Sequence, residues 1–210
     1  MKIKLENNSQ RDELIPMLDD MASDINLLKK VASRFGKVGS NIQLQPICIN
    51  DLLEANVNYF TKRLPHFNNE INISHKAKHK NVTLMLDEEL ILWAFENLVK
   101  NCIDAMIHKS GKIVFTSYKT DNKFYILVKD NGTGMPKSMY KKIFEPGITT
   151  KARGWGLGLS LTKRIIEEYH KGKIRVLEST VNKGTTFEIV LQINPEKERF
   201  SLLKKYLYLK

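Results

Sequence analysis

The chain has 210 residues, 42% of them hydrophobic and 27% charged, which is enough to bury a sizeable core in one domain with an appendage or in two small domains. No run of about 18 apolar residues occurs, so we expect no membrane-spanning helix, and the first six residues lack the apolar stretch of a secretory signal. The net charge of +11 favours an anionic partner (nucleic acid, an acidic protein or a polyphosphate) without choosing among them.

Residues 11–35 are predicted to form one helix with a narrow apolar stripe. The apolar positions recur in alternating steps of four and three residues, at Leu14, Leu18, Met21, Ile25, Leu28, Ala32 and Phe35. This is the spacing of a coiled-coil seam, which suits another helix better than the side of a sheet. Gly36 then ends the helix, because glycine tolerates the conformation found after a helix C-terminus. An ordinary amphipathic helix packed on its own domain is the alternative.

The rest of the chain alternates helical and extended segments. Asn50 is the expected N-cap of one helix, and Asp87 starts a long helix that runs to about Lys109. Strands are expected at 71–74, 82–86, 113–118, 124–129, 174–178 and 185–193, a glycine-punctuated loop with one short helix at 130–155, and a further helix at 157–171. This order predicts α+β layers with helices on one face of a mostly antiparallel sheet.

The long helix carries the first chemically distinctive cluster. Asn97, Asn101 and Asp104 are spaced i, i+4 and i+7, so they project from one face of the helix. An amide oxygen is a hard, neutral ligand suited to Mg²⁺, and the amide N–H₂ can donate to a phosphate. The alternative is that both asparagines lie on a solvated face.

The second cluster, residues 130–136, follows an expected strand directly. Gly132 and Gly134 allow the backbone to turn sharply and to approach a ligand closely. An aspartate at the strand end, Asp130, could accept a hydrogen bond from an exocyclic amine such as adenine N6. In isolation, however, Asp-Asn-Gly is more often only a turn.

The third cluster is a glycine-rich loop that leads into a helix. Gly154, Gly156 and Gly158 alternate before the helix, whose first N–H groups and positive dipole end can cradle a phosphate. Lys151 and Arg153 lie just upstream and supply positive charge. A fourth cluster, residues 183–187, is a turn into a strand and has no meaning on its own.

Together these clusters resemble the ATP-binding catalytic domain of sensor histidine kinases, in the superfamily that includes gyrase, Hsp90 and MutL. The family's boxes occur in order as an N box (97–105), a G1 box (Asp130, Gly132, Gly134), an F box (Phe144-Glu145-Pro146), a G2 box (Gly154, Gly156, Gly158) and a G3 box (Gly184-Thr185, Phe187). The resemblance covers residues 45–194 and implies a Bergerat-type two-layer α/β sandwich with a mixed, mostly antiparallel sheet. Residues 1–40 resemble the second helix of the dimerisation and phosphoacceptor hairpin, and residues 195–210 are expected to form a basic amphipathic tail.

The resemblance implies a site for ATP or ADP with Mg²⁺. It implies that Asn101 ligates Mg²⁺, that Asn97 contacts the phosphates, and that Asp130 recognises adenine while Thr185 assists through water. Residues 135–155 would form a mobile lid. The expected nucleotide-binding residues are Asn97, Asn101, Asp104, Asp130, Gly132, Gly134, Met135, Phe144 (the lid's apolar anchor), Thr149, Thr150, Lys151, Gly154, Trp155, Gly156, Leu157, Gly158, Leu159 and Thr185, and the expected catalytic residues are Asn97 and the lid cations Lys151 and Arg153.

One departure from the wider superfamily concerns hydrolysis. In the ATP-hydrolysing relatives, a glutamate one helical turn before the Mg²⁺-binding asparagine activates water, and Asn97 occupies that position here. An amide cannot take a proton, and Glu96 lies about 100° further around the helix. We therefore expect slow or absent ATPase activity.

A second departure is that the phosphoacceptor motif of the family is missing. That motif is a histidine next to an acid, with a proline four residues beyond the acid, and none of the histidines 66, 75, 79, 108 and 170 is in this setting. We expect the chain to be a fragment of a longer kinase that donates the γ-phosphate to a histidine outside the chain, and we expect no autophosphorylation of this chain alone. A natural protein that has lost its acceptor is the alternative.

The partners implied by the resemblance are the phosphoacceptor helix of the parent kinase and the receiver domain of a response regulator, with a homodimer in the full-length protein. Cys48 and Cys102 are too few for a disulfide framework and lack metal-ligand spacing, so we expect reduced thiols in a cytoplasmic location, whether or not the parent protein is attached to a membrane. No nucleic-acid partner is expected, because the basic residues are scattered with few aromatic residues among them. The alternatives are a superfamily ATPase and a non-catalytic nucleotide-sensing or basic interaction module.

Overall fold

The computed structural model describes residues 42–63, 71–106, 110–149 and 155–193. The chain divides into two compact units, Met1–Ile42 and Gln43–Lys210, and every described helix and strand belongs to the second unit. The helix expected at 11–35 and the tail expected at 195–210 lie outside the described residues. Within the described ranges, no helix is long and apolar enough to cross a membrane.

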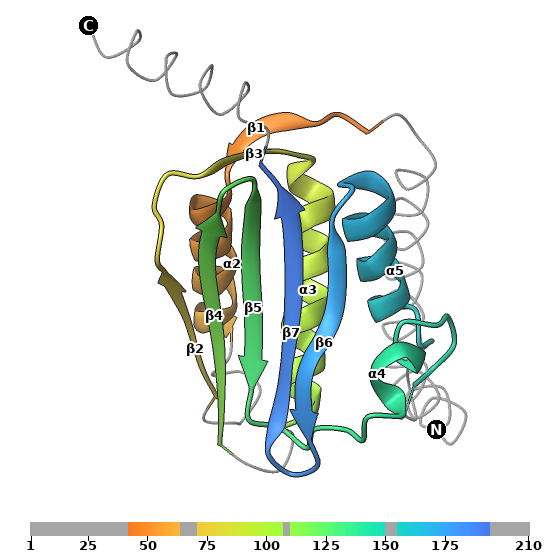
Figure 1. The fold of residues 1–210 in the computed structure, drawn as a ribbon. Coiled ribbons are helices and arrows are strands. Elements are labelled where there is room, and N and C mark those ends of the chain that lie inside the picture. Colours follow the sequence, from red (N-terminus) through yellow and green to blue (C-terminus); the bar gives the residue numbers. More distant parts are fainter. Residues whose placement is uncertain (1–41, 64–70, 107–109, 150–154, 194–210) are drawn as a thin grey trace, which may run out of the picture. The chain divides into compact units, whose positions relative to one another are not determined.

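A five-stranded sheet carries helices on one face (Figure 1). Its strands are β2 (Ile71–Ala77), β4 (Gly111–Thr120), β5 (Lys123–Asp130), β6 (Lys173–Thr180) and β7 (Gly184–Gln192), in the order β2-β4-β5-β7-β6. β2 and β4 pair in parallel and the other neighbours pair antiparallel. A separate antiparallel pair is formed by β1 (Gln45–Cys48) and β3 (Thr83–Leu86). The helices are α2 (Ile49–Arg63), α3 (Glu88–Asp104), α4 (Met139–Lys142) and α5 (Gly158–Arg164), which continues as the π-helix η2 (Ile165–Tyr169). This mixed sheet with helices on one face confirms the predicted fold class.

The core lies between the sheet and the helices. Successive side chains of a strand point to opposite faces, and alternate residues of the central strands are fully buried, among them Ile113, Phe115, Phe124, Ile126 and Val128. Burial of each such side chain stabilises the fold by about 1.5–3 kcal/mol. The buried side chains on the helix-covered face therefore stabilise the packing of the helices on the sheet. Polar side chains at the strand ends can contribute to a binding site.

Helix α3 begins as predicted and ends earlier than predicted. The Asp87 carboxylate caps it by accepting the Leu90 N–H at 3.1 Å. The helix ends at Asp104, before the expected Lys109, and the Ala105 carbonyl just beyond this end accepts the N–H of Thr133 at 3.0 Å. The loop after β5 thus contacts the C-terminal end of this helix.

Two other local predictions are wrong. Asn50 does not cap α2, which already begins at Ile49. The Asn50 side chain is buried, donates to the His79 carbonyl at 2.7 Å and accepts from the Ser117 hydroxyl at 3.0 Å. The helix expected at 157–171 changes to the wider π-helix at Ile165 and ends at Tyr169.

Candidate functional site

The side chain of Asp130 lies at the end of β5 on the helix-covered face, and it is almost fully buried. Its Oδ1 accepts the N–H of Gly132 at 2.7 Å and the N–H of Thr185 at 3.2 Å. The first bond closes the turn after β5, and the second joins that turn to the start of β7. The carboxylate is thus fixed by the backbone on two sides, which orients it as an acceptor for a donor group such as an amine.

The predicted polar face of α3 is partly shielded from solvent. Asn97, Asn101 and Asp104 are half-buried, whereas the intervening Leu98 and Cys102 are buried in the core. The three polar residues therefore share one side of the helix, as their spacing predicted, and they are not on a fully solvated surface.

The loop after β5 packs directly on the end of α3. A Cβ at Gly132 would lie 2.6 Å from the Ala105 Cβ, so only glycine allows this approach. Gly134 has a φ of +61°, and a Cβ there would overlap the Thr180 carbonyl oxygen. This close contact holds the loop that follows Asp130 against the C-terminal end of α3, the helix that carries the asparagines.

Cys102 contributes a neutral thiol next to Asp130. Burial raises the pKa of the Cys102 thiol well above its usual value, and the neighbouring Asp130 carboxylate raises it further through its charge and a hydrogen bond. Cys102 is therefore protonated at neutral pH and does not introduce a second negative charge beside Asp130.

The predicted lid is anchored at both described ends. Phe144 is buried and packs edge-to-face on Phe187, with ring centroids 6.5 Å apart. The Gly147 N–H donates to the Gly156 carbonyl at 3.1 Å, and a Cβ at Gly156 would lie 2.5 Å from the Gly147 carbonyl carbon. The backbone at Gly147 is thereby held beside the backbone that directly follows the lid, and Trp155 next to this junction is 76% exposed.

Helix α5 starts at Gly158, against the asparagine face of α3. The Asn97 Nδ2 donates to the Gly158 carbonyl at 3.4 Å, and a Cβ at Gly158 would lie 3.8 Å from the Asn97 amide carbon. Leu157 and Leu159, on either side of Gly158, are half-buried. The structure thus brings the start of the glycine-led helix next to Asn97.

The remaining expected site residues lie partly inside and partly outside the described ranges. Thr149 is exposed, the backbone N–H of Met135 donates to the Ser179 hydroxyl at 2.9 Å, and Thr185 is buried. Thr150, Lys151, Arg153 and Gly154 lie outside the described residues. The positions of the two expected lid cations, Lys151 and Arg153, therefore stay a prediction.

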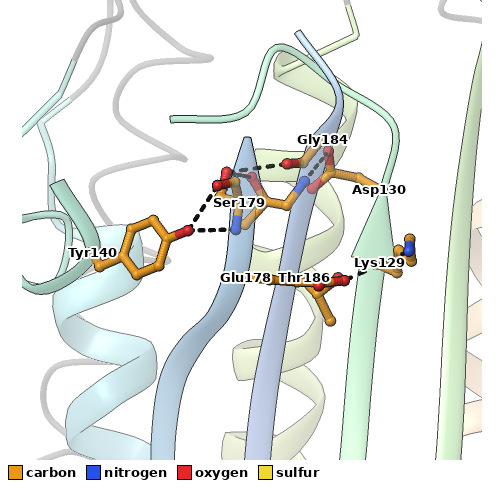
Figure 2. A network of polar contacts seen from close by, with 8 residues as sticks. Lys129, Asp130, Tyr140, Glu178, Ser179, Gly184 and Thr186 are labelled. Atoms are coloured by element: carbon orange, nitrogen blue, oxygen red, sulfur yellow. Dashed lines mark hydrogen bonds and ion pairs between the residues drawn. The ribbon is translucent and has the colours of Figure 1, made fainter. Parts of the chain in front are cut away.

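Two site residues escaped the sequence analysis, Tyr140 and Ser179 (Figure 2). The Tyr140 hydroxyl bonds to both backbone groups of Ser179, and the Ser179 hydroxyl contacts the Thr185 hydroxyl at 2.9 Å. Ser179 pairs with Thr185 across β6 and β7. The register between β6 and β7 is set by tertiary structure. A serine in a strand before a turn carries no sequence pattern that would have predicted it.

The donor set fits a magnesium ion that is held mainly by a bound phosphate. Among the residues that the structure describes, no group of three or more histidine, cysteine, aspartate or glutamate side chains could hold a metal. The half-buried side chains of Asn97 and Asn101 on α3 carry amide oxygens, which are of the ligand type that Mg²⁺ takes. Mg²⁺ commonly takes one or two protein oxygens together with substrate phosphates and water, so this chemistry fits.

The family model for "Histidine kinase-, DNA gyrase B-, and HSP90-like ATPase" matches residues 86–195, just over half of the chain. This range spans α3, the loop after β5, the lid and the closing strands, which are the elements that build the site. The chain belongs to this family. Within it, the histidine kinases among its relatives identify the chain as a histidine kinase catalytic, ATP-binding domain.

One curated relative of this kinase domain is the signal transduction histidine-protein kinase AtoS of Escherichia coli (strain K12). It is 43% identical over 111 residues, which cover 52% of this chain and 18% of AtoS. Sporulation kinase C of Bacillus subtilis (strain 168) is 39% identical over 110 residues, which cover 52% of this chain and 25% of that kinase. The chain thus spans a quarter or less of the length of these relatives.

Among solved structures, the kinase domain is similar to the catalytic domain of the histidine kinase ThkA. The TM-score is 0.65 at 31% identity, and the match covers 74% of this chain and 99% of that domain. The described fold therefore corresponds to the whole of a separately solved catalytic domain.

Proposed function

We propose that this kinase domain binds Mg²⁺–ATP and donates the γ-phosphate to a histidine outside the chain, as the catalytic part of a two-component sensor histidine kinase. The observation that carries the proposal is the Asp130 carboxylate, which is fixed by two backbone N–H groups and is followed by a loop that packs on the end of α3, the helix that carries Asn97 and Asn101. A fixed acceptor suits the purine amine, and the amide face suits the phosphates.

The residues divide into a purine end and a phosphate end. Asp130 would accept from the adenine amine, with Thr185 beside it. Asn97, next to the start of α5, would donate to the phosphates, and Asn101 would contribute an amide oxygen to Mg²⁺. The ion, when bound, neutralises phosphate charge. Lys151 and Arg153 are proposed as lid cations that contact the γ-phosphate.

The same residues favour transfer to an acceptor over hydrolysis. Asn97 occupies the position of the water-activating base in the ATP-hydrolysing relatives, and its amide cannot take a proton. Its Nδ2 instead lies 3.4 Å from the Gly158 carbonyl oxygen. What the chain supplies is positioning and charge neutralisation, and the incoming imidazole supplies the nucleophile.

The proposed partners extend beyond this chain. A solved structure of ThkA in complex with the response regulator protein TrrA, with a TM-score of 0.67 at 25% identity over 84% of this chain and 50% of that one, supports a response regulator as the recipient of the phosphate. We also propose a phosphoacceptor helix of the parent kinase, a homodimer in the full-length protein and a cytoplasmic location. Residues 1–40 are proposed as part of the phosphoacceptor hairpin, 45–194 as the ATP-binding domain and 195–210 as a basic tail.

Calorimetric titration with ATP, with and without Mg²⁺, tests the proposal. Asp130→Asn replaces an acceptor oxygen by an N–H₂ donor, so we expect the affinity for ATP and ADP to fall about 10- to 100-fold, the range for loss of a hydrogen bond to a charged group. Asn101→Ala is expected to remove most of the increase in ATP affinity that Mg²⁺ provides.

The control for the titration is Asp121→Asn, the same chemical change in the exposed turn between β4 and β5, which is expected to leave both affinities unchanged. Binding of ATP by Asp130→Asn as tightly as by the unmodified chain would contradict the proposed purine site.

A further inference from the structure

Ser179 lies where the lid, the closing strands and the purine end of the site meet (Figure 2). It is near the end of β6, one of the two edge strands of the sheet, and its strand partner is Thr185 of β7. Both side chains lie on the helix-covered face, because Thr186 and Glu178, their neighbours in sequence, bond to each other on the opposite face. Ser179 is therefore one strand away from the residue whose N–H donates to Asp130.

The Ser179 hydroxyl has every hydrogen-bonding position occupied. It accepts the N–H of Met135 at 2.9 Å and donates its only proton to the Gly184 carbonyl at 3.0 Å. The Thr185 hydroxyl lies 2.9 Å away. Because a hydroxyl carries one proton and two lone pairs, the three contacts can form together only when Thr185 donates to Ser179. The proton of Thr185 is thereby committed, and its oxygen is left to act only as an acceptor.

Tyr140 holds Ser179 in this place. Outward-facing backbone groups of an edge strand have no neighbouring strand to bond. The Tyr140 hydroxyl, which comes from α4, accepts the Ser179 N–H at 2.5 Å and donates to the Ser179 carbonyl at 2.7 Å. One phenol thus replaces a missing strand at this residue, and it ties the first part of the lid to β6.

The consequence is a purine end that presents acceptors. The Asp130 carboxylate accepts, and so does the Thr185 oxygen once its proton points to Ser179. At position 6, a 6-aminopurine brings a donor to such a surface, whereas a 6-oxopurine brings another acceptor. When an acceptor lies against an acceptor, buried polar groups are left unpaired. A binding site discriminates strongly against a ligand that leaves its polar groups unpaired in this way.

We infer that Ser179 is a specificity-determining positioning residue that makes the site prefer 6-amino- over 6-oxopurine nucleotides by fixing the Thr185 hydroxyl as an acceptor, and that Tyr140 supports it. This inference rests on the proposed function, in which the purine lies at Asp130.

The test measures the affinities for ATP and for ITP, which differs from ATP in carrying a 6-oxo group, by calorimetry in Mg²⁺. Ser179→Ala frees the Thr185 hydroxyl to rotate and donate, so the ratio of ATP to ITP affinity is expected to fall about tenfold, the effect of one hydrogen bond. Ser179→Thr keeps the hydroxyl and is expected to keep the ratio within about twofold. Tyr140→Phe leaves the Ser179 side chain in place and is expected to lower the ratio about threefold, well below the effect of losing a whole hydrogen bond.

Two matched variants serve as controls. Thr186→Val removes the neighbouring threonine hydroxyl on the opposite face, and Tyr125→Phe removes a phenol from a tyrosine that stacks on Tyr118. Neither is expected to change the ratio. Equal weakening of ATP and ITP in Ser179→Ala and in Tyr140→Phe would mean a purely structural role and would overturn the inference alone. Failure of the unmodified chain to bind ATP would overturn the proposed function and this inference with it.

Discussion

Single glycines decide whether the purine end of the site can form. Gly184 begins β7 with a φ of +106°, in the left-handed region that favours glycine. A Cβ at this position would overlap the Asp130 carbonyl oxygen and lie 2.7 Å from the Asn131 Cα. The backbones of two strands thus approach each other here, and that approach lets the Thr185 N–H reach the Asp130 carboxylate.

Gly184→Ala is therefore expected to destabilise the domain and to weaken ATP binding. The matched control is Gly147→Ala, which also has a positive φ (+84°) but has nothing within 4 Å of an added Cβ. The control should cost only the conformational strain, about 1–2 kcal/mol, whereas Gly184→Ala adds the overlap with backbone atoms. Thermal and denaturant unfolding of both variants measures the difference. An equal loss of stability would show that the close approach at Gly184 is unimportant.

At the scale of elements, His170 connects the end of η2 with the start of α3. Its Nε2 accepts the Asp87 N–H at 3.0 Å and its Nδ1 donates to the Ile165 carbonyl at 2.8 Å. Only neutral imidazole can accept and donate in this way. Burial lowers the pKa of His170, and the bond to Ile165 and the charge of Asp87 only partly oppose this. Protonation would place two donors face to face at the cap of α3.

This geometry predicts a stability that depends on pH. Because the pKa of His170 is lower in the folded chain, the unfolded chain binds the proton more readily. The free energy of unfolding should then fall as the pH is lowered through 6.5, the usual histidine pKa, toward the folded pKa. One proton contributes a slope of at most about 1.4 kcal/mol per pH unit.

Urea unfolding between pH 7.5 and 5.5 measures that slope. His170→Gln keeps one donor and one acceptor but cannot titrate, so its slope is expected to be smaller than that of the unmodified chain. His75, whose pKa is also lowered by burial, contributes to both proteins and cancels in the comparison. Identical slopes would rule out a contribution from His170.

At the scale of the whole molecule, the sequence contains the elements of the proposed ATP site but not the family's acceptor motif. The site elements all lie within residues 86–195, and none of the chain's histidines has the adjacent acid and following proline of the family's acceptor motif. The net charge of +11 favours an anionic ligand. The proposed lid cations contribute to this charge, and a nucleoside triphosphate is such a ligand.

Incubation of the chain with γ-labelled ATP and Mg²⁺ is accordingly expected to yield no acid-labile, histidine-linked label. The same reaction should release free phosphate slowly or not at all, because Asn97 cannot act as a general base. Chromatography of the labelled protein and of the released phosphate provides both readouts. Stable label on any one histidine of the chain would refute the first expectation, and steady turnover the second.

The sequence by itself determined the fold class, the order of the elements around the site and most of the candidate residues. The common face of Asn97 and Asn101 could be predicted because helical spacing is a local property, and the sharp turn at Gly132 because glycine permits a close backbone approach. The cap at Asp87 followed from the same local chemistry.

Only the tertiary structure decided the contacts that cross between elements. The end of α3 contacts the loop that follows β5, the buried position of Asn50 depends on strands far along the chain, and the role of Ser179 depends on the register of β6 against β7. Propensity and periodicity report on neighbours in sequence, whereas each of these features is set by a hydrogen bond between residues that are distant in sequence or that belong to different elements.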